Sequence, residues 1–131
     1  MPSDEHYFRE PGHAERQTRI RFRDWRFRVR DILTAVEAIA AYTEGMTYED
    51  FVADPKTMGA VLRNLVTIGE STRWIPGPVL EAHPAVPWRT MRGVRNVVAH
   101  QYFGVDKRIL WTTVEKDLPP LAPALEAVLQ S

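Results

Sequence analysis

The amino-acid sequence predicts an all-α bundle of four main helices with short extra turns. Apolar residues recur every three or four positions along most of the chain, which is the period of an α-helix with one buried face. Glycines and prolines gather between these stretches, and no pair of alternating runs flanks a tight turn as a β-hairpin would require. We therefore expect helices joined by short connections.

Length and composition indicate one globular domain. The chain has 131 residues, of which 44% are hydrophobic and 26% charged, which suits a single compact core. We expect residues 1–18, which lack a hydrophobic period, to be a flexible tail and residues 19–131 to form the domain. There is no cysteine, which excludes disulfides and thiolate metal sites and fits a reducing compartment. Without an apolar leader or a run of about 18 apolar residues, we expect a cytoplasmic protein with no membrane span.

The first predicted helix begins near Ile20 and closes before Gly45. Its start alternates with a period of two, as a strand would, but a longer pattern with steps of three and four overrides this signal. That pattern consists of Phe22, Trp25, Val29, Ile32, Val36 and Ile39. Seven arginines between Arg16 and Arg30 resemble an RNA-binding stripe. We expect them to scatter around the helix, mostly solvated, with a minority contacting phosphates.

The next helix has two start signals. Thr47 and Asp50 form a possible capping box, in which a hydroxyl and a carboxylate satisfy free amides and open a short turn. Asp54 and Pro55 then restart the helix, because proline suits the first helical position. The apolar spacing continues to about Trp74. We therefore predict a short turn followed by a second long helix.

The remaining chain predicts two more helical segments. Residues 76–87 are rich in proline and should be a loop with at most one turn. Trp88 to Tyr102 reads as a helix, and Asp106 can cap the last segment. Pro119-Pro120 should break or kink that segment near its middle.

The helix from Trp88 to Tyr102 carries the residues with chemical potential. At about 100° per residue, Arg92, Asn96 and His100 fall nearly opposite an apolar side. That apolar side consists of Met91, Val94, Val97 and Val98. Arginine binds phosphate oxygens through paired hydrogen bonds, and histidine exchanges protons near neutral pH. The pattern therefore suggests phosphodiester chemistry that needs no metal.

Arg95 does not share the face of His100. The two positions are about 140° apart on a straight helix, so Arg95 shares a stripe with Ala99 and Tyr102 instead. Bringing both onto one phosphate needs either an irregular helix end at Phe103-Gly104 or a second copy of the helix across a two-fold axis. We favour the dimer.

Several of these residues also have structural explanations. A histidine near a helix C-terminus is a favourable partner for the helix dipole, and an outward arginine can simply be solvated. Glu70 and Asp31 could orient site groups, but we expect each to be a surface or helix-end charge. We expect the four tryptophans to serve packing rather than base stacking. They are Trp25, Trp74, Trp88 and Trp111.

From about Trp25 to the C-terminus the sequence resembles the HepT family of HEPN-domain proteins. The matching stretches are Asp31-Ile32-Leu33, Tyr42 to Thr47, Phe51, Ala60 to Leu65, Ile68-Gly69-Glu70, Ile75-Pro76, Val86-Pro87-Trp88, Arg92 to Asn96, His100, Tyr102 to Asp106 and Trp111. This ordered set is far more specific than the R-x4-H string alone. The departures are Ser71, where the family often has alanine, and the arginine-rich segment before Trp25.

The resemblance implies a HEPN-type bundle that acts as the ribonuclease toxin of a HepT/MntA toxin–antitoxin pair. It implies a homodimer that cuts RNA without a metal or other cofactor, with Arg95 and His100 as catalytic residues and Arg92 and Asn96 in support. It also implies that a MntA-like nucleotidyltransferase antitoxin adenylylates Tyr102. A second hypothesis stays open, in which the chain is a non-catalytic HEPN subunit that binds nucleotide or a nucleotidyltransferase surface.

Overall fold

The computed structural model describes residues 13–102 and 106–131, and every regular element in these ranges is helical. The all-α prediction is confirmed. The elements are α2 (His13–Thr43), α3 (Tyr48–Val52), α4 (Pro55–Arg73), α5 (Gly77–Ala82), α6 (Trp88–Tyr102), α7 (Lys107–Thr112), the π-helical turn η1 (Thr113–Asp117) and α8 (Leu121–Gln130). Within the described ranges, no helix is long and apolar enough to cross a membrane.

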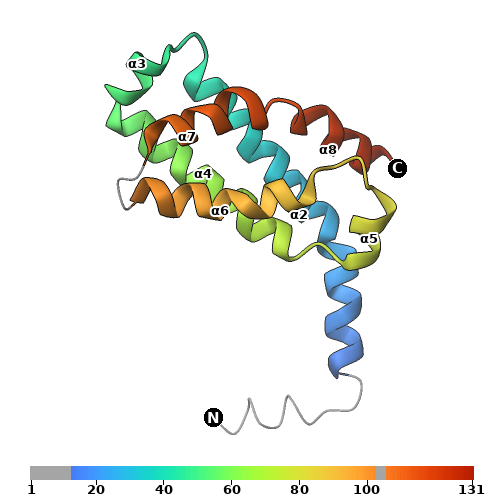
Figure 1. The fold of residues 1–131 in the computed structure, drawn as a ribbon. Helices are drawn as coiled ribbons and strands as arrows, with labels where there is room; N and C mark the ends of the chain where they lie inside the picture. Colours follow the sequence, from blue (N-terminus) through green and yellow to red (C-terminus); the bar gives the residue numbers. More distant parts are fainter. Residues whose placement is uncertain (1–12, 103–105) are drawn as a thin grey trace, which may run out of the picture.

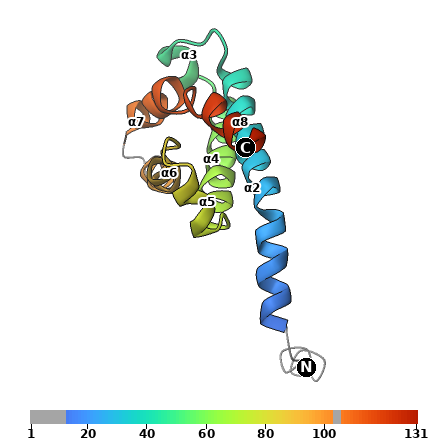
Figure 2. The same cartoon turned by 90° about the vertical axis from the view of Figure 1, so that its right-hand side faces the viewer.

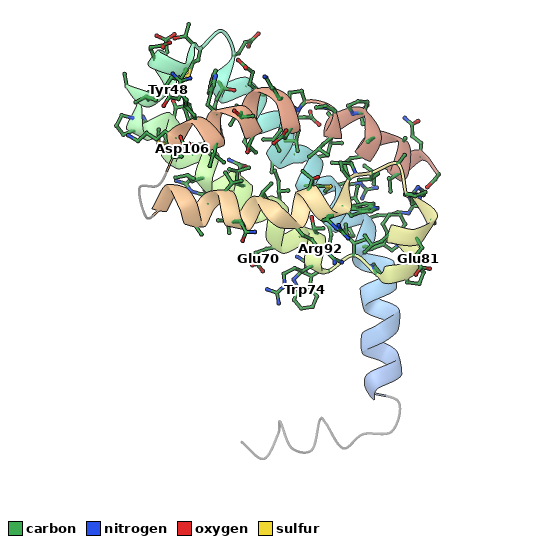
Figure 3. The ribbon with its side chains drawn as sticks, in the orientation of Figure 1. Tyr48, Glu70, Trp74, Glu81, Arg92 and Asp106 are labelled. Carbon is green, nitrogen blue, oxygen red and sulfur yellow. The ribbon has the colours of Figure 1, made fainter. Side chains whose placement is uncertain are left out.

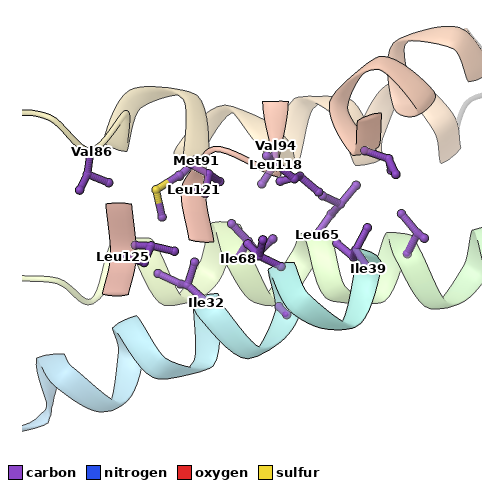
Figure 4. Packing of buried hydrophobic residues seen from close by; sticks show 14 of the residues in the cluster. Ile32, Ile39, Leu65, Ile68, Val86, Met91, Val94, Leu118, Leu121 and Leu125 are labelled. Carbon is purple, nitrogen blue, oxygen red and sulfur yellow. The ribbon is translucent and has the colours of Figure 1, made fainter. Parts of the chain in front are cut away.

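Four long helices enclose the core. α2 packs along α4, α6 lies against the opposite side of α4, and α8 covers α2 (Figure 1). Their inward residues follow the predicted spacing and are almost fully buried, as Figure 4 shows for the centre of the bundle. Among the largest buried side chains are Ile32, Ile39, Leu65, Ile68, Met91 and Leu125. Burial of these side chains is the main force that holds α6 in place.

The predicted capping signals are present at the start of α3 and α4. The Thr47 hydroxyl accepts a hydrogen bond from the Asp50 amide at 3.1 Å, and the Asp50 carboxylate accepts one from the Thr47 amide at 3.0 Å. Asp54 caps α4 through the Thr57 amide at 3.0 Å. Before them, Gly45 ends α2 with a φ of 75°, a conformation that favours glycine.

The helix α2 begins earlier than the sequence indicated. It starts at His13, inside the segment 1–18 that we expected to be a flexible tail, and residues 1–12 lie outside the described part of the chain. The amino-terminal half of α2 extends beyond the bundle as a single protruding helix (Figures 1 and 2). A helix of 31 residues is about 46 Å long at 1.5 Å per residue.

The last predicted segment is divided into three pieces. Pro119 and Pro120 separate η1 from α8, as the sequence predicted. The Leu118 amide donates to the Thr113 carbonyl at 3.0 Å, five residues back, which closes the π turn. The proline-rich segment after α4 contains the short helix α5, slightly longer than the one turn expected.

Candidate functional site

The helix α6 is fixed at its beginning by Trp88. This side chain is buried, and its indole nitrogen donates a hydrogen bond to the His83 carbonyl at 3.0 Å. One turn later, Met91 and Val94 are 0% and 3% exposed against the core. A buried indole with a satisfied N–H group is a strong local anchor, because ring and hydrogen bond restrict the same side chain. The start of α6 therefore has a defined orientation on the bundle.

The outer face of α6 is polar, as the helical wheel predicted. Arg92 and Asn96 are exposed, whereas Val97 and Val98 are half-buried on the flanks of the apolar side. Figure 3 shows Arg92 at the edge of the bundle, away from the core. The helix therefore presents an arginine and an amide outward within two turns. A phosphate or a second protein surface can reach both.

The side chains of Arg95, His100 and Tyr102 lie outside those that the structure describes. Their backbone belongs to α6, which continues without interruption to Tyr102. Positions 95 and 100 are therefore about 140° apart around the helix and about 7.5 Å apart along it. Arg95 and His100 both precede Phe103-Gly104. An irregular helix end at Phe103-Gly104 would therefore come after both residues and would not change the angle between them. Their joint action stays a prediction.

The two acidic candidates lie on different helices. Asp31 is exposed on α2. Glu70 is half-buried on α4, and its carboxylate lies 3.3 Å from the Arg73 guanidinium. α4 packs beside α6, so Glu70 is the one on a helix neighbouring the motif. Both were expected as surface or helix-end charges, and Asp31 fits that description directly.

Three of the four tryptophans serve packing, and the fourth does not fit this expectation. Trp88 is buried, and Trp25 and Trp111 are half-buried against the core. The Trp111 ring lies 5.1 Å from the Phe51 ring. Trp74, which follows α4, is 43% exposed, and the Arg28 guanidinium lies 5.6 Å from its ring centre. Trp74 is thus a surface aromatic beside an arginine.

A pocket that the sequence did not predict lies on the other flank of α6. It has a volume of about 240 Å³ between α6, η1 and α8. Its lining is mainly apolar, from Met91, Val94 and Leu118 among others, with Asp117 as the acidic member. The sequence contains only part of the signal for this pocket. Pro119-Pro120 indicates a helix break, but nothing in the sequence indicates the π turn beside it. Among the side chains that the structure describes, no three acidic or histidine groups gather to hold a metal ion.

Comparison with known proteins assigns the family. A family model described as "Ribonuclease HepT-like" matches residues 32–128, a range that contains all of α6. The chain belongs to the HepT-like ribonuclease family. This confirms the resemblance found in the sequence and places the Arg95-Asn96 and His100 positions inside the family's own segment.

Relatives of this HepT-like chain support the same assignment. A protein from Thermococcus cleftensis named "Probable ribonuclease HepT" is 45% identical over 96 residues, which cover 73% of this chain and 87% of the relative. A protein from Caldanaerobacter subterraneus subsp. tengcongensis named as a candidate RNase is 38% identical over 99 residues, covering 76% and 88%. No solved structure shows a significant match.

Proposed function

We propose that this HepT-like protein is the toxin of a toxin–antitoxin pair, a cytoplasmic endoribonuclease that cuts RNA without a metal ion. The observation that carries the proposal is the family match over residues 32–128. That segment contains an arginine, an amide and a histidine in the order Arg95-Asn96…His100 on one continuous helix. Arginine and histidine together supply charge stabilisation and proton transfer, the two functions that RNA cleavage requires.

The chemistry assigns one role to each residue. His100 accepts the proton of a ribose 2′-hydroxyl, whose oxygen then attacks the adjacent phosphorus. Arg95 stabilises the negative charge that develops on the pentacoordinate phosphorane. A protonated imidazole then gives its proton to the departing 5′-oxygen. The products are a 2′,3′-cyclic phosphate and a 5′-hydroxyl, and Arg92 and Asn96 position the RNA backbone.

Helical geometry favours a site shared by two protomers. Arg95 and His100 diverge by about 140° on one helix, and the outer face of α6 with Arg92 and Asn96 is exposed. A two-fold axis beside this face would bring Arg95 of one protomer toward His100 of the other. It would also supply two imidazoles, one for the base and one for the acid.

Tyr102 is the proposed point of control. A nucleotidyltransferase antitoxin would attach AMP to its hydroxyl, two residues after His100. The added phosphate is anionic and would occupy the site that otherwise receives the RNA phosphate, excluding RNA by repulsion and bulk.

The test of catalysis uses purified protein and RNA in the presence of EDTA. Wild type should cut the RNA, whereas His100→Ala and Arg95→Ala should lose most activity, because each removes a group needed in the transition state. The matched controls are His83→Ala and Arg63→Ala, the first a half-buried histidine and the second an exposed arginine outside α6. Intact RNA with wild type, or cutting by the α6 variants at the control rate, would contradict the proposal. Intact RNA together with tight binding to a nucleotidyltransferase would favour the non-catalytic alternative.

The test of control is intact-mass analysis after incubation with the antitoxin and ATP. Wild type should gain the mass of one adenylyl group and lose its ribonuclease activity. Tyr102→Phe should gain nothing, while Tyr42→Phe, which removes another exposed tyrosine hydroxyl, should be modified normally. Modification of Tyr102→Phe would show that another residue accepts the group.

A further inference from the structure

Positive charge is concentrated in the protruding half of α2, although the chain as a whole is neutral. Residues 13–30 carry seven arginines against two carboxylates, Glu15 and Asp24, a net charge of +5. The remaining ten basic and fifteen acidic residues leave a net charge of −5 for the rest of the chain. A local positive field of this kind attracts a polyanion even when the whole molecule has no net charge.

At 100° per residue, five of these seven arginine positions fall on one side of the helix, and Arg21 and Arg28 fall away from it. The five follow one another in steps of three and four residues, and on a helix such positions form one stripe about 80° wide. We call these positions the arginine stripe: Arg16, Arg19, Arg23, Arg26 and Arg30. The stripe spans about 21 Å of the helix, in steps of roughly 5 Å. Evenly spaced cations of this kind suit the repeating charges of a nucleic-acid backbone.

At the base of the protruding helix, arginines alternate with aromatic rings. The Arg30 guanidinium lies 5.5 Å from the ring centre of Phe27, which is 59% exposed. The Arg26 guanidinium lies 4.4 Å from the Trp25 ring and donates to the Leu129 carbonyl at 3.0 Å. Arg26 also donates to the Ser131 backbone oxygen at 3.1 Å, so its guanidinium is held at the end of α8, whereas Arg30 is exposed beside the Phe27 ring.

Exposed rings beside arginines distinguish this surface from an ordinary solvated helix. Trp74 lies beside Arg28 on the neighbouring flank, so a second surface aromatic stands near the base of α2. Bases of a single strand stack on aromatic rings and on guanidinium planes, while the phosphates pair with the cations. The family match begins at residue 32, so the arginine stripe lies outside the segment that matches the HepT-like family.

We propose that the amino-terminal half of α2 is an arm that binds single-stranded RNA, with the arginine stripe except Arg26 on the phosphates and Phe27 stacking on a base. The inference deepens the proposed function, on which it rests, by stating how this ribonuclease holds its substrate. The arm acts in binding and not in the chemical step. Its loss should raise KM for RNA and leave kcat unchanged.

The test measures binding of a fluorescent 2′-O-methyl RNA single strand, which has no 2′-hydroxyl to attack, at increasing KCl concentration. The arm variant is Arg16→Gln with Arg19→Gln and Arg23→Gln. The slope of log K against log salt should fall by about 2, because each lost phosphate contact on a single strand removes roughly 0.7. The matched control, Lys56→Gln with Arg63→Gln and Lys116→Gln, removes the same charge from exposed positions of the bundle and should leave the slope unchanged.

Two further variants separate charge, stacking and folding. Lysine at the three arm positions should keep most of the salt dependence, and both lysine and glutamine support helix formation, which circular dichroism verifies. Phe27→Ser should weaken binding at least about fivefold with little change of slope, because stacking depends weakly on salt.

Wild-type binding by the arm variant at every salt concentration, or an equal loss in the control, would overturn the inference. So would a defect that appears only in binding a nucleotidyltransferase. Because the probe is not cleaved, binding without any ribonuclease activity would count against the proposed function and not against the arm.

Discussion

Single residues determine how closely another molecule can approach α6. Gly93 is half-exposed on the helix beside the pocket, and a Cβ atom built there would meet no described atom within 4 Å outside its own stretch of helix. Gly59 on α4 is exposed and has the same free space. Neither glycine has a positive φ, so alanine fits the backbone at both positions. The two glycines therefore form a matched pair, one on the motif helix and one outside it.

We expect Gly59→Ala and Gly93→Ala each to raise the free energy of unfolding by roughly 0.4–1 kcal/mol, because alanine reduces the entropy of the unfolded chain and favours helix. Urea unfolding of the two variants measures this. Gly59→Ala should cleave RNA like wild type.

A difference between Gly59→Ala and Gly93→Ala in dimerisation would indicate a contact between protomers at Gly93. If Gly93→Ala is more stable than wild type but dimerises poorly, its new methyl group meets a partner across the two-fold axis; poor cleavage with normal dimerisation would instead point to the pocket that Gly93 lines. Destabilisation of both variants would show that the helices cannot accept these side chains.

At the scale of elements, the start of α4 depends on one carboxylate. Asp54 accepts hydrogen bonds from the Thr57 hydroxyl at 2.6 Å and from the Thr57 amide at 3.0 Å. The hydroxyl contact is the main cause that lowers the pKa of Asp54 below the ordinary value of an aspartate. Because the lowered pKa belongs to the folded state, ionised Asp54 adds stability above about pH 4 that disappears as the pH falls through the lowered pKa.

Asp54→Asn should therefore weaken the acid sensitivity of the fold while keeping a side chain that can cap the helix. Wild type should lose more free energy of unfolding than Asp54→Asn between about pH 5 and about pH 2. Urea unfolding at several pH values measures the difference. Parallel pH profiles for the two proteins would show that the lowered pKa contributes nothing measurable.

The elements that the sequence predicted well are those whose signals are local. The spacing of apolar residues places Met91 and Val94 inward and Arg92 outward, and the capping pair before α3 needs only four adjacent residues. The π turn was missed because five-residue hydrogen bonding depends on how α7 and α8 pack, not on composition. The exposure of Trp74 was missed for the same reason, since it depends on where α4 ends against α2.

The candidate site could be predicted only in part. The family match covers the helix that carries Arg95 and His100, and the roles of these two residues stay predictions from the sequence. The helical period determines the directions of Arg95 and His100 around α6. It does not determine which residues of another protomer lie opposite them. The proposed convergence of Arg95 and His100 depends on an assembly, which one chain's sequence does not contain.

At the scale of the whole molecule, mixed dimers test that assembly. Arg95→Ala and His100→Ala proteins, each inactive alone, should regain part of the ribonuclease activity after they are mixed and allowed to exchange subunits. The reason is that a mixed dimer can combine the remaining His100 of one protomer with the remaining Arg95 of the other. A matched mixture with Arg63→Ala in place of one partner calibrates the exchange. No recovery despite verified exchange would show that one Arg95 and one His100 on different protomers do not suffice for cleavage.

The basic residues 13–30, with a net charge of +5, and residues 31–131, with nine basic and twelve acidic residues and a net charge of −3, also give the protein an electric dipole. With a basic end and an acidic body, the neutral molecule can still turn its arm toward a polyanion before contact, so that the association rate should fall as salt screens the field. The same dipole lets the arm of one molecule meet the acidic body of another. At low ionic strength, near the sequence isoelectric point of about 6.9, we therefore expect head-to-tail association that dissolves when salt is added.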